Sequence, residues 1–395
     1  MKLLQLNATA NWGSTGKIAE GIGQAAIDRG WESYIAFGRE YNQSASKLIK
    51  VGSQLDVYVH YAHSRFLNRE GFGSRNATKQ LIKQIINIGP DIIQLHNIHD
   101  HWLNYPLLFG YLATIDTPVF WTFHDCWGFT GGCFHFTEPN CDKWKILCKK
   151  CPINNTFIAK TISNYLRKKE LFNSLSGRLR IISVSNWLDS LVGKSFLSNN
   201  SHMVIHNGVD TELFKPTHNS SLKEKLGLDG KNVLLGVSNV WSNHKGLSDF
   251  IELRKLLPDK YAIVLVGLKS NEIKCLPHGI IGIKRTDSVK DLVHLYSMAN
   301  FVVSLSQAET FGMTLAEGLA CGTPCISYNS SGTQEVISRD TGFLFQQGDV
   351  KAINEILRHN PVFDSDICRQ RALTLFNKDT QFNKYIDLYD SIIQS

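Results

Sequence analysis

Short apolar runs rich in β-branched residues alternate with helix-forming stretches along almost the whole chain of 395 residues. This alternation predicts parallel β-sheets covered by helices. The first series of expected strands comprises residues 3–7, 33–37, 91–96, 119–124, 180–185 and 203–206. The second series comprises residues 233–237, 262–267, 280–283, 301–305 and 325–328. We therefore expect an α/β fold of two Rossmann-like domains that face a cleft.

The connection between the two series is polar and broken by turn residues. Residues 207–230 contain NGVD, a Lys-Pro pair and a Ser-rich patch, which indicate an interdomain connection. A chain of this length can bury two cores. We therefore divide it into a first domain of residues 1–207 and a second of residues 208–375. The amphipathic stretch 376–395 predicts a helix that packs back on the first domain.

Composition excludes several classes of protein. The net charge of +7 is modest and fits a surface that faces phosphates or anionic lipid rather than a dedicated nucleic-acid binder, and the chain shows no RNA- or DNA-binding motif. The N-terminal residues lack the apolar core of a signal peptide, and no apolar stretch approaches the length of a membrane span. We expect a cytoplasmic protein that could work at the inner face of the cell membrane.

Two glycine-rich motifs fail as phosphate-binding loops. GSTGK at residues 13–17 resembles a P-loop, but Asn11 replaces its first glycine and Ile18 stands where a Ser or Thr would bind Mg²⁺. GIGQAA at residues 21–26 falls inside the expected helix and not at its start. What remains is a glycine-bearing loop ending at Gly16. We count it among the donor-binding candidates, with a plain strand-to-helix turn as an equal alternative.

Glu309 and Glu317 flank a strand-to-helix turn. The apolar run 301–305 predicts a buried strand, and residues 314–320 are good helix formers. The loop between them would lie at the carboxyl edge of a parallel sheet, where a helix N-terminus presents N–H groups and positive dipole to an anion. We expect a sugar nucleotide here, although by spacing alone two solvated glutamates on a helix surface are the commoner case.

Three motifs in order resemble those of one enzyme family. ETFGMTLAE, followed by GLACGTPCI, resembles the donor-site signature of retaining family 4 glycosyltransferases, which have the two-domain glycosyltransferase-B fold. IHNGVDTELFKP at residues 205–216 and HKGLSDF at residues 244–250 are similar to further stretches of that family. The resemblance covers essentially the whole chain. FWTFHDCWGFTGGC at residues 120–133 is most similar to transferases that build bacterial exopolysaccharides such as colanic acid.

The resemblance implies a reaction and its partners. Such an enzyme moves a sugar from a nucleotide-sugar donor to a glycan or an undecaprenyl-linked acceptor, with retention of anomeric configuration. No metal or cofactor is needed for catalysis, because cations and backbone N–H groups stabilise the departing diphosphate. Two alternatives stay open. They are a nucleotide-sugar epimerase on a similar scaffold and an inactive carbohydrate-binding scaffold.

The resemblance makes Lys245 the cation that meets the diphosphate. Taken alone, a loop lysine is usually solvated. The family commonly places an Arg shortly before this lysine as a second phosphate clamp. Here the nearby positions hold Asn239, Asn243 and His244. We expect Asn239 or His244 to replace that Arg only in part, which keeps the inactive scaffold under consideration.

The glutamate pair receives two different roles from the resemblance. Glu317 is expected to accept hydrogen bonds from ribose hydroxyls, a task that suits a carboxylate, and Glu309 to reach the transferred sugar. The backbone N–H groups of Phe311, Gly312 and Met313 would meet sugar hydroxyls or phosphate at the helix start. Neither glutamate is expected to act as a glycosidase acid or nucleophile.

His124 follows the apolar run 119–123, so it should project from a sheet edge. It matches the active-site histidine of the family. There it would hydrogen-bond the donor sugar or stabilise charge at the anomeric carbon. The alternative is a structural histidine at a strand end. In the front-face retaining reaction that the family implies, the leaving phosphate can itself accept the acceptor's proton.

The first domain also carries a cysteine-rich insertion at residues 126–152. Cys133, Cys141, Cys148 and Cys151 form C-x7-C-x6-C-x2-C, in which the final C-x2-C is typical of half a zinc site. A closed structural zinc, buried thiols and disulfides all stay open, although a reducing compartment disfavours disulfides.

Residues 164–180 combine basic and apolar side chains. Arg167, Lys168, Lys169, Arg178 and Arg180 alternate with leucines and a phenylalanine, the pattern of a basic amphipathic helix. Such a helix can lie on anionic lipid, which would suit a lipid-linked acceptor. A solvated helix face is the commoner alternative.

Overall fold

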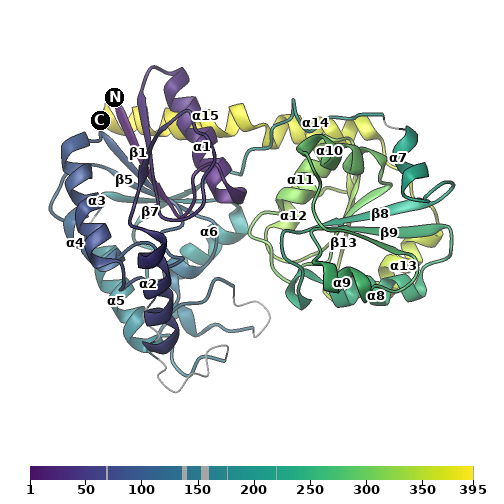
Figure 1. The fold of residues 1–395 in the computed structure, drawn as a ribbon, viewed down its shortest axis with the longest axis horizontal. Coiled ribbons are helices and arrows are strands. Elements are labelled where there is room, and N and C mark those ends of the chain that lie inside the picture. The colour runs from purple at the N-terminus through teal and green to yellow at the C-terminus, as the bar shows by residue number, and fades with distance from the viewer. Residues whose placement is uncertain (68–69, 136–139, 153–159, 176, 219, 395) are drawn as a thin grey trace. The chain divides into compact units, whose positions relative to one another are not determined.

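The computed structural model describes residues 1–67, 70–135, 140–152, 160–175, 177–218 and 220–394. It divides the chain into two compact units, which we describe one at a time (Figure 1). Unit 1 comprises Met1–His206 together with Asp379–Ser395, and unit 2 comprises Asn207–Lys378. The first of these boundaries lies next to the one expected at residue 207, and the second lies a few residues beyond the one expected at residue 375.

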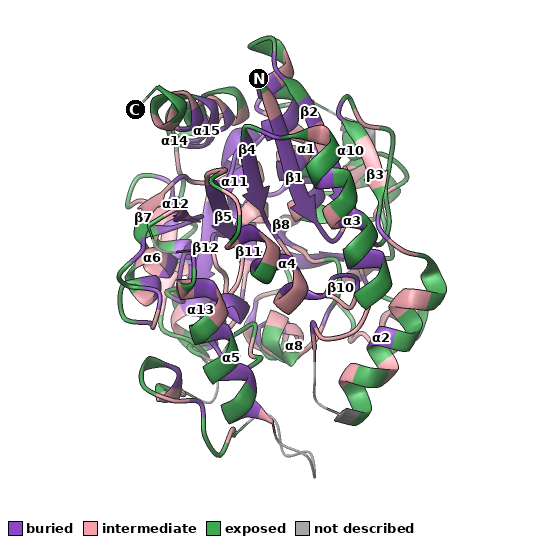
Figure 2. Ribbon diagram, turned by 90° about the vertical axis from the view of Figure 1, so that its left-hand side faces the viewer, coloured by how far each residue is buried: buried purple, intermediate pink, exposed green. Residues whose placement is uncertain are grey.

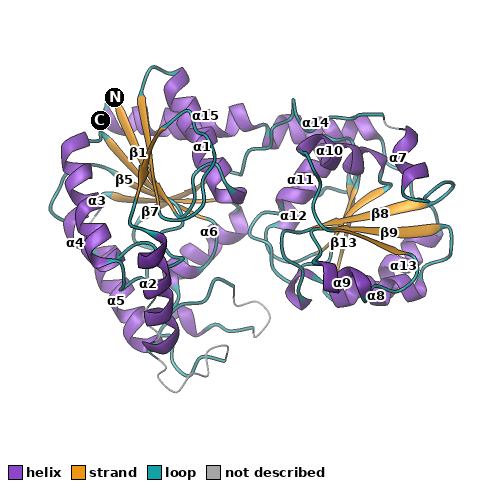
Figure 3. Cartoon of the chain, in the orientation of Figure 1, coloured by secondary structure: helices purple, strands orange, loops and turns teal. Residues whose placement is uncertain are grey.

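Unit 1 is built on a seven-stranded sheet in the order β3-β2-β1-β4-β5-β6-β7. All of its neighbouring strands run parallel (Figure 3). The strands are β1 (Lys2–Asn7), β2 (Glu32–Phe37), β3 (Lys47–Lys50), β4 (Ile92–Leu95), β5 (Val119–Phe123), β6 (Leu179–Ser183) and β7 (Ser201–Val204). The central strands β4 and β5 are buried along their whole length, as expected for a sheet covered on both faces (Figure 2).

The helices of unit 1 mostly connect successive strands. They are α1 (Gly13–Asp28), α2 (Gln54–Leu67), α3 (Arg75–Ile88), α4 (Tyr105–Leu112), α5 (Thr161–Asn173), α6 (Asn186–Val192) and α15 (Lys378–Ile393). Local sequence explains the start of α4. Asn104 precedes α4 and its side chain accepts a hydrogen bond from the Leu107 N–H, and Pro106 occupies an early helical position where it forfeits no intrahelical bond.

Helix α15 completes the core of unit 1 from the far end of the chain. Phe382 and Tyr389 pack in one cluster with Ile22 of α1 and Phe120 of β5. Its tyrosines also bond the sheet, since the Tyr389 hydroxyl donates to Gln94 Oε1 at 2.7 Å. Burying each large apolar side chain contributes about 1.5–3 kcal/mol, so this helix is a structural part of unit 1.

Unit 2 has a six-stranded sheet in the order β10-β9-β8-β11-β12-β13, again with all neighbours parallel. Its strands are β8 (Asn232–Val237), β9 (Tyr261–Val266), β10 (Ile280–Ile283), β11 (Phe301–Ser304), β12 (Cys325–Tyr328) and β13 (Gly342–Phe345). Counted from β8, the strand order is that of a doubly wound Rossmann sheet. The expected fold of two Rossmann-like domains is therefore confirmed.

The helices of unit 2 are α7 (Ser220–Lys225), α8 (Leu247–Leu256), α9 (Ser270–Lys274), α10 (Val289–Met298), α11 (Met313–Ala320), α12 (Thr333–Val336), α13 (Val350–Arg358) and α14 (Ser365–Phe376). Spacing explains why α13 packs as it does. Val350, Ile353 and Leu357 recur on one face and are buried in the sheet's core cluster. Asp349 caps the helix by accepting from the Ala352 N–H at 3.0 Å.

The structure corrects the prediction of one basic amphipathic helix over residues 164–180. Helix α5 ends at Asn173, and Arg180 lies on β6. Lys168 is 2% exposed, and its Nζ donates to the Trp127 carbonyl at 2.7 Å. Arg178 donates instead to the carbonyls that follow α4, including Ala113 O at 3.2 Å. Sequence periodicity cannot distinguish a lysine that faces solvent from one that satisfies a buried carbonyl.

Among the described residues, no helix combines the length and apolar character needed to cross a bilayer.

Candidate active site

The predicted donor-binding residues of unit 2 gather at the point where its strand order reverses. Strands β8 and β11 are neighbours at the centre of the sheet, and the chain leaves them in opposite directions. In doubly wound sheets, the loops that follow such a pair form the crevice that binds ligand. Lys245 lies in the loop after β8, and Glu309 lies in the loop after β11.

Hydrogen bonds fasten these two loops to each other. The Gln307 N–H donates to the His244 carbonyl at 2.9 Å, and His244 Nδ1 lies 3.1 Å from Gln307 Oε1. Gly246 follows Lys245 with a φ of 75°, and a Cβ there would come within 2.2 Å of the Leu305 carbonyl oxygen. Only glycine permits that approach and that backbone conformation, so the position of Lys245 is set by the turn.

Lys245 and Glu309 form an ion pair. Lys245 Nζ lies 2.6 Å from Glu309 Oε1, with the two side chains 37% and 24% exposed. The Glu309 backbone is also fixed, because its N–H donates to Ser331 Oγ at 2.8 Å and its carbonyl accepts from the Gly332 N–H at 2.8 Å. The Lys245 ammonium group therefore lies at the carboxyl edge of the sheet, paired with the Glu309 carboxylate. A bound anion can take the place of that carboxylate.

Helix α11 begins beside this pair. Gly312 is its N-cap with a φ of 106°, and no side chain caps the helix. Met313 is the first helical residue. The Phe311 side chain is 1% exposed and packs against the Phe376 ring at a centroid distance of 5.3 Å. Phe311 can therefore offer a ligand only its backbone, while its side chain packs in the core. An uncapped helix start suits an anionic or hydroxyl-bearing ligand.

Glu317 lies farther along α11 and receives a hydrogen bond from a buried tyrosine. The Tyr296 hydroxyl of α10 donates to Glu317 Oε2 at 2.7 Å. Burial and the neighbouring Glu317 carboxylate raise the pKa of Tyr296 well above its ordinary value, so the hydroxyl remains a donor. Tyr296 therefore fixes the orientation of the Glu317 carboxylate, a role that the sequence did not reveal.

Asn239 and His244 do not supply a second fixed cation. Asn239 is exposed in the loop after β8, and the exposed His244 ring bonds Gln307. Residues 238–245 contain no arginine. Lys245 is therefore the one permanently charged side chain in this loop.

In unit 1, Gly16 lies in the first turn of α1 and has a structural explanation. A Cβ at this position would come within 2.7 Å of Thr9 Oγ1, and the Gly16 carbonyl accepts from the Asn11 N–H at 3.2 Å. The absent side chain lets the loop after β1 fold tightly onto the helix. This geometry supports the strand-to-helix turn and leaves donor binding by Gly16 as a prediction.

His124 lies at the end of β5 and belongs to a hydrogen-bonded chain. Gln5 Nε2 donates to the Ala19 carbonyl at 2.7 Å, so Gln5 Oε1 must accept from His96 Nε2, which lies 3.1 Å away. A neutral His96 then offers Nδ1 as the acceptor for His124 Nε2 at 3.2 Å. Burial lowers the pKa of His124 to about 4, and it holds the pKa of His96 well below its ordinary value. Both rings are therefore neutral at pH 7.

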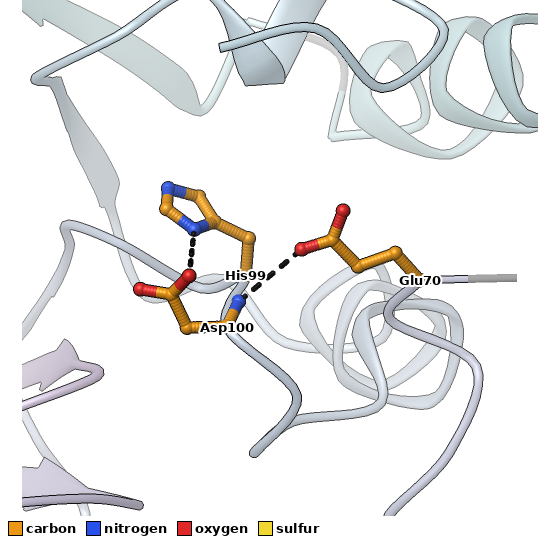
Figure 4. A group of neighbouring side chains, drawn as sticks. All are labelled: Glu70, His99 and Asp100. Atoms are coloured by element: carbon orange, nitrogen blue, oxygen red, sulfur yellow. Dashed lines mark hydrogen bonds and ion pairs between the residues drawn. The ribbon is translucent and has the colours of Figure 1, made fainter. Parts of the chain in front are cut away.

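A third histidine near this edge, His99, is charged. His99 Nε2 lies 2.9 Å from Asp125 Oδ2, and His99 Nδ1 lies 3.2 Å from Asp100 Oδ1, at ion-pair distance but poorly aligned for a hydrogen bond (Figure 4). Burial alone would lower the pKa of His99, but the carboxylates of Asp125 and Asp100 outweigh it and raise the pKa to about 10. The group Glu70, His99 and Asp100 has ligand atoms within 4.8 Å of one another, and a metal ion bound there would have to displace the proton of His99.

Sequence reasoning missed Gln5, His96, His99 and Asp125. A signal was available for two of them. His96 directly follows β4 and Asp125 lies just beyond β5, and these strands are parallel neighbours. Because the carboxyl ends of parallel neighbours meet at one edge, polar residues at both ends indicate a shared site.

The four predicted zinc ligands lie around one pocket in unit 1. Cys133, Cys141, Cys148 and Cys151 all line it, together with Thr130, Lys143, Trp144, Lys149 and Thr161. Burial and the neighbouring thiols raise the pKa of Cys133 to about 12. Residues 136–139 of the cysteine-rich insertion lie outside the described part of the chain.

Comparison with known proteins identifies glycosyltransferase sequences in both units. Residues 17–213 match the model of Glycosyltransferase Family 4, and residues 219–359 match that of Glycosyl transferases group 1. The chain is 25% identical to the putative colanic acid biosynthesis glycosyl transferase WcaC of Escherichia coli K12, over 99% of this chain and 100% of that protein. It is also 25% identical, over 48% of this chain and 54% of the relative, to the N,N'-diacetylbacillosaminyl-diphospho-undecaprenol alpha-1,3-N-acetylgalactosaminyltransferase of Campylobacter jejuni.

A solved structure shares the fold over nearly the full length. The Alr3699/HepE protein of Anabaena, crystallised with UDP and glucose, matches with a TM-score of 0.70 at 15% identity, over 99% of this chain and 100% of that one. At 15% identity, this likeness concerns the fold alone. Together with the two family models, it shows that the chain belongs to the glycosyltransferases of glycosyltransferase-B fold.

Proposed function

We propose that this glycosyltransferase moves a sugar from a nucleotide-sugar donor to a glycan or lipid-linked oligosaccharide in the synthesis of a bacterial surface polysaccharide, with retention of anomeric configuration. The WcaC relative is described as a colanic acid transferase, and the Campylobacter relative acts on a diphospho-undecaprenol substrate. Both descriptions favour a polymer or carrier-linked acceptor over a small free sugar.

The ion pair between Lys245 and Glu309 carries this proposal. Its cation lies at the switch point of the unit 2 sheet, next to an uncapped helix start, where a donor diphosphate would be bound. The diphosphate would compete with Glu309 for Lys245. Glu309 would then be released to hydrogen-bond the transferred sugar, while Lys245 stabilises the leaving group. The pair thus holds both groups in place before the donor arrives.

Glu317 has the properties of a ribose-binding carboxylate. The Tyr296 hydroxyl fixes it at 2.7 Å, so it loses little freedom when it accepts hydrogen bonds from two adjacent hydroxyls. In this proposal neither glutamate attacks the anomeric carbon. Lys245 and backbone N–H groups take the role that a metal would play, so the chemistry itself needs no added divalent cation.

His124 is proposed to act as a neutral hydrogen-bonding group. The chain from Gln5 through His96 sets its tautomer with the proton on Nε2. A fixed neutral imidazole can bond the donor sugar or stabilise charge that builds at the anomeric carbon, without itself carrying a permanent charge.

The decisive experiment incubates the protein with a panel of nucleotide sugars and measures transfer or slow donor hydrolysis. Glu309→Ala and His124→Ala should reduce turnover by about 10²–10³-fold each, because each removes a group placed where charge develops. Lys255→Ala, on the exposed face of α8, is the matched control and should leave turnover unchanged. Adding Mg²⁺ or Mn²⁺ should not raise the rate, and NMR of the product should show the donor's anomeric configuration.

Other outcomes would replace the proposal. Sugar interconversion in the absence of acceptor would indicate an epimerase. Nucleotide-sugar binding without hydrolysis or transfer to any acceptor would indicate a carbohydrate-binding scaffold. An inverted product would remove the retaining mechanism but keep the transferase.

We extend the proposal to a membrane contact through α5. Its exposed face combines Ile162 and Leu166 with Arg167 and Lys169, a pattern that suits an anionic lipid surface. Sedimentation with phosphatidylglycerol vesicles tests this contact. The double variant Leu166→Glu, Arg167→Glu should bind several-fold less, whereas Phe66→Glu on α2 should bind as the wild type does. Equal binding by wild type and the α5 variant would exclude the contact.

A further inference from the structure

Four thiols from separate points of the chain lie around one pocket in unit 1. The segment that carries them runs between the short 3-10 helix Trp127–Phe129 and α5. Cys133 comes before the undescribed residues 136–139, and the other three ligands come after them. Cys133 and Cys151 line the same pocket, although 18 positions separate them in sequence. The fold therefore brings together the two ends of the C-x7-C-x6-C-x2-C pattern.

The described part of this segment has little regular structure of its own. Within the described residues between 130 and 152, its regular secondary structure is the three-residue 3-10 helix Lys143–Lys145. Trp144 anchors this turn, since its ring meets Phe129 at 5.2 Å and its carbonyl accepts from the Tyr165 hydroxyl at 3.0 Å. One buried tryptophan fixes one point of the loop. A loop of this kind gains most from a cross-link that ties several points together.

Burial disfavours a free thiolate in this pocket, but two kinds of contact would stabilise thiolates that bind a cation. The Gly131 N–H donates to Cys148 Sγ at 3.3 Å, a contact that orients and stabilises a ligating thiolate. Lys143 and Lys149 also line the pocket and supply positive charge. Four thiolates around a divalent cation leave a net charge of −2, which the two ammonium groups balance.

The composition of the cluster selects the ion. Four cysteines with no carboxylate are the ligand set of structural zinc, which is bound by tetrahedral thiolates at about 2.3 Å. All nine cysteines are free thiols. Cys126 is fully buried and does not line the pocket. It is therefore a core thiol and not a fifth candidate ligand.

We propose that Cys133, Cys141, Cys148 and Cys151 bind one structural Zn²⁺ that ties residues 130–135 to residues 140–152. The four sulfurs line one pocket, and binding would bring each of them to the distance of about 2.3 Å from the ion that zinc thiolates adopt. The ion has four protein ligands and no open position, so it does not take part in sugar transfer. Its effect on the active site passes through the packing of Trp144 on Phe129, which follows His124 along the chain.

The test begins with metal analysis of untagged protein purified without chelator. We expect about one zinc per chain, and Co²⁺ substitution should give the intense visible absorption of a tetrahedral thiolate site. Blocking thiols with a mercurial should release the zinc into a colorimetric indicator. These measurements use the wild-type chain and do not depend on any variant folding.

Variants then assign the ligands. Cys148→Ser and Cys151→Ser should lower the zinc content at least tenfold, whereas Cys275→Ser, an exposed cysteine in unit 2, should retain it. Chelation of the wild type should open residues 130–152 to limited proteolysis while the digestion pattern of unit 2 stays the same. Less than one zinc per ten chains in fresh protein, or disulfides among the four cysteines by mass spectrometry, would overturn the proposal whether or not the enzyme transfers sugar.

Discussion

His96 and His124 share a hydrogen bond of 3.2 Å although they stand at the ends of different strands, 28 positions apart in the sequence. Their rings also stack at a centroid distance of 5.4 Å. Because Gln5 directs the proton of His96 onto Nε2, the Ala19 carbonyl sets the tautomer of His124 through two intervening side chains, Gln5 and His96. His96 is thus a positioning residue for His124.

The two histidines should differ when mutated. His124→Ala is expected to lower kcat by about 10²–10³-fold, because it removes a group aimed at developing charge. His96→Ala should lower kcat by about tenfold with little change in the donor KM, since it loosens only the orientation of His124. His96→Gln, which can still accept from His124, should recover part of the rate. Equal losses in both alanine variants, with no recovery by glutamine, would contradict a positioning role.

The buried neutral histidines make stability depend on pH. The pKa values of His60 and His124 are lowered to about 4, so the unfolded chain binds more protons than the folded one between about pH 4 and the ordinary value of 6.5. The stability that these two neutral histidines contribute should therefore be complete above pH 6.5 and fall as the pH drops toward 4, by a total on the order of a few kcal/mol. Urea unfolding across this range measures the loss. A smaller slope in His60→Gln would identify one contributor.

His99 predicts the opposite dependence at alkaline pH. Its pKa is raised to about 10, so its contribution is present below pH 6.5 and is lost as the pH rises through 10. In His99→Gln the urea midpoint should be lower at pH 7, and it should no longer fall as the pH rises toward 10. A wild-type midpoint that stays constant up to pH 10.5 would show that the pairing with Asp125 and Asp100 adds no stability.

Lys245→Met should separate binding of the diphosphate from folding. The substitution keeps most of the side-chain volume and removes the charge, so kcat/KM should fall by about 10²–10³-fold. The lost ion pair is half-exposed and contributes only about 0.2–1 kcal/mol, so the melting temperature should hardly move. Isothermal titration with a nucleoside diphosphate gives the binding loss, with Lys255→Met as the control. Undiminished affinity would place the diphosphate elsewhere.

Tyr296→Phe tests the orientation of Glu317. The change removes one hydrogen bond at 2.7 Å and keeps the ring, so the donor Kd should rise several-fold while stability falls by about 1 kcal/mol. Tyr261→Phe is a matched control, because the Tyr261 hydroxyl bonds the Leu357 carbonyl in the same unit. If both variants bind donor equally well, Glu317 does not depend on Tyr296.

Lys168 and Lys169 are adjacent but should respond differently. Lys168 is buried, its Nζ lies 3.3 Å from the centre of the Trp127 ring, and it satisfies a buried carbonyl. Lys168→Ala should destabilise unit 1 by about 2–4 kcal/mol, whereas Lys169→Ala on the exposed face should stay within about 0.5 kcal/mol. Thermal unfolding compares the two. Similar melting temperatures would mean that Lys168 contributes little in its buried position.

The central strands could be predicted from sequence, but two edge strands could not. Runs such as residues 301–305 are apolar on both faces because helices cover both sides of the sheet. The edge strands β3 (Lys47–Lys50) and β13 (Gly342–Phe345) are only four residues long, and their burial is partial. Lysines at both ends of β3 and a glycine at the start of β13 remove the β-branched signal. These two strands form because they hydrogen-bond to their neighbours, β3 to β2 and β13 to β12.

The residues of the candidate site also divide into those that could be predicted from sequence and those that could not. Glu309, Glu317, Lys245 and His124 sit beside turns whose sequence is itself distinctive. Their supporting contacts depend on side chains that meet only after folding, such as Tyr296 with Glu317, so no spacing within the chain reveals them. The burial of Lys168 on α5 could not be predicted for the same reason. The carbonyl that it bonds belongs to Trp127, which lies outside that helix.

Helix α15 determines when each half of the protein can finish folding. Unit 2 is a continuous segment, Asn207–Lys378, and it can close as soon as that segment has left the ribosome. Most of unit 1 is synthesised before unit 2, yet Phe382, Tyr385 and Tyr389 of its core are made only after the whole of unit 2. The nascent first half must therefore wait with an open apolar groove across α1 and β5. Chaperone demand during synthesis should accordingly fall on the half of the chain that emerges earliest.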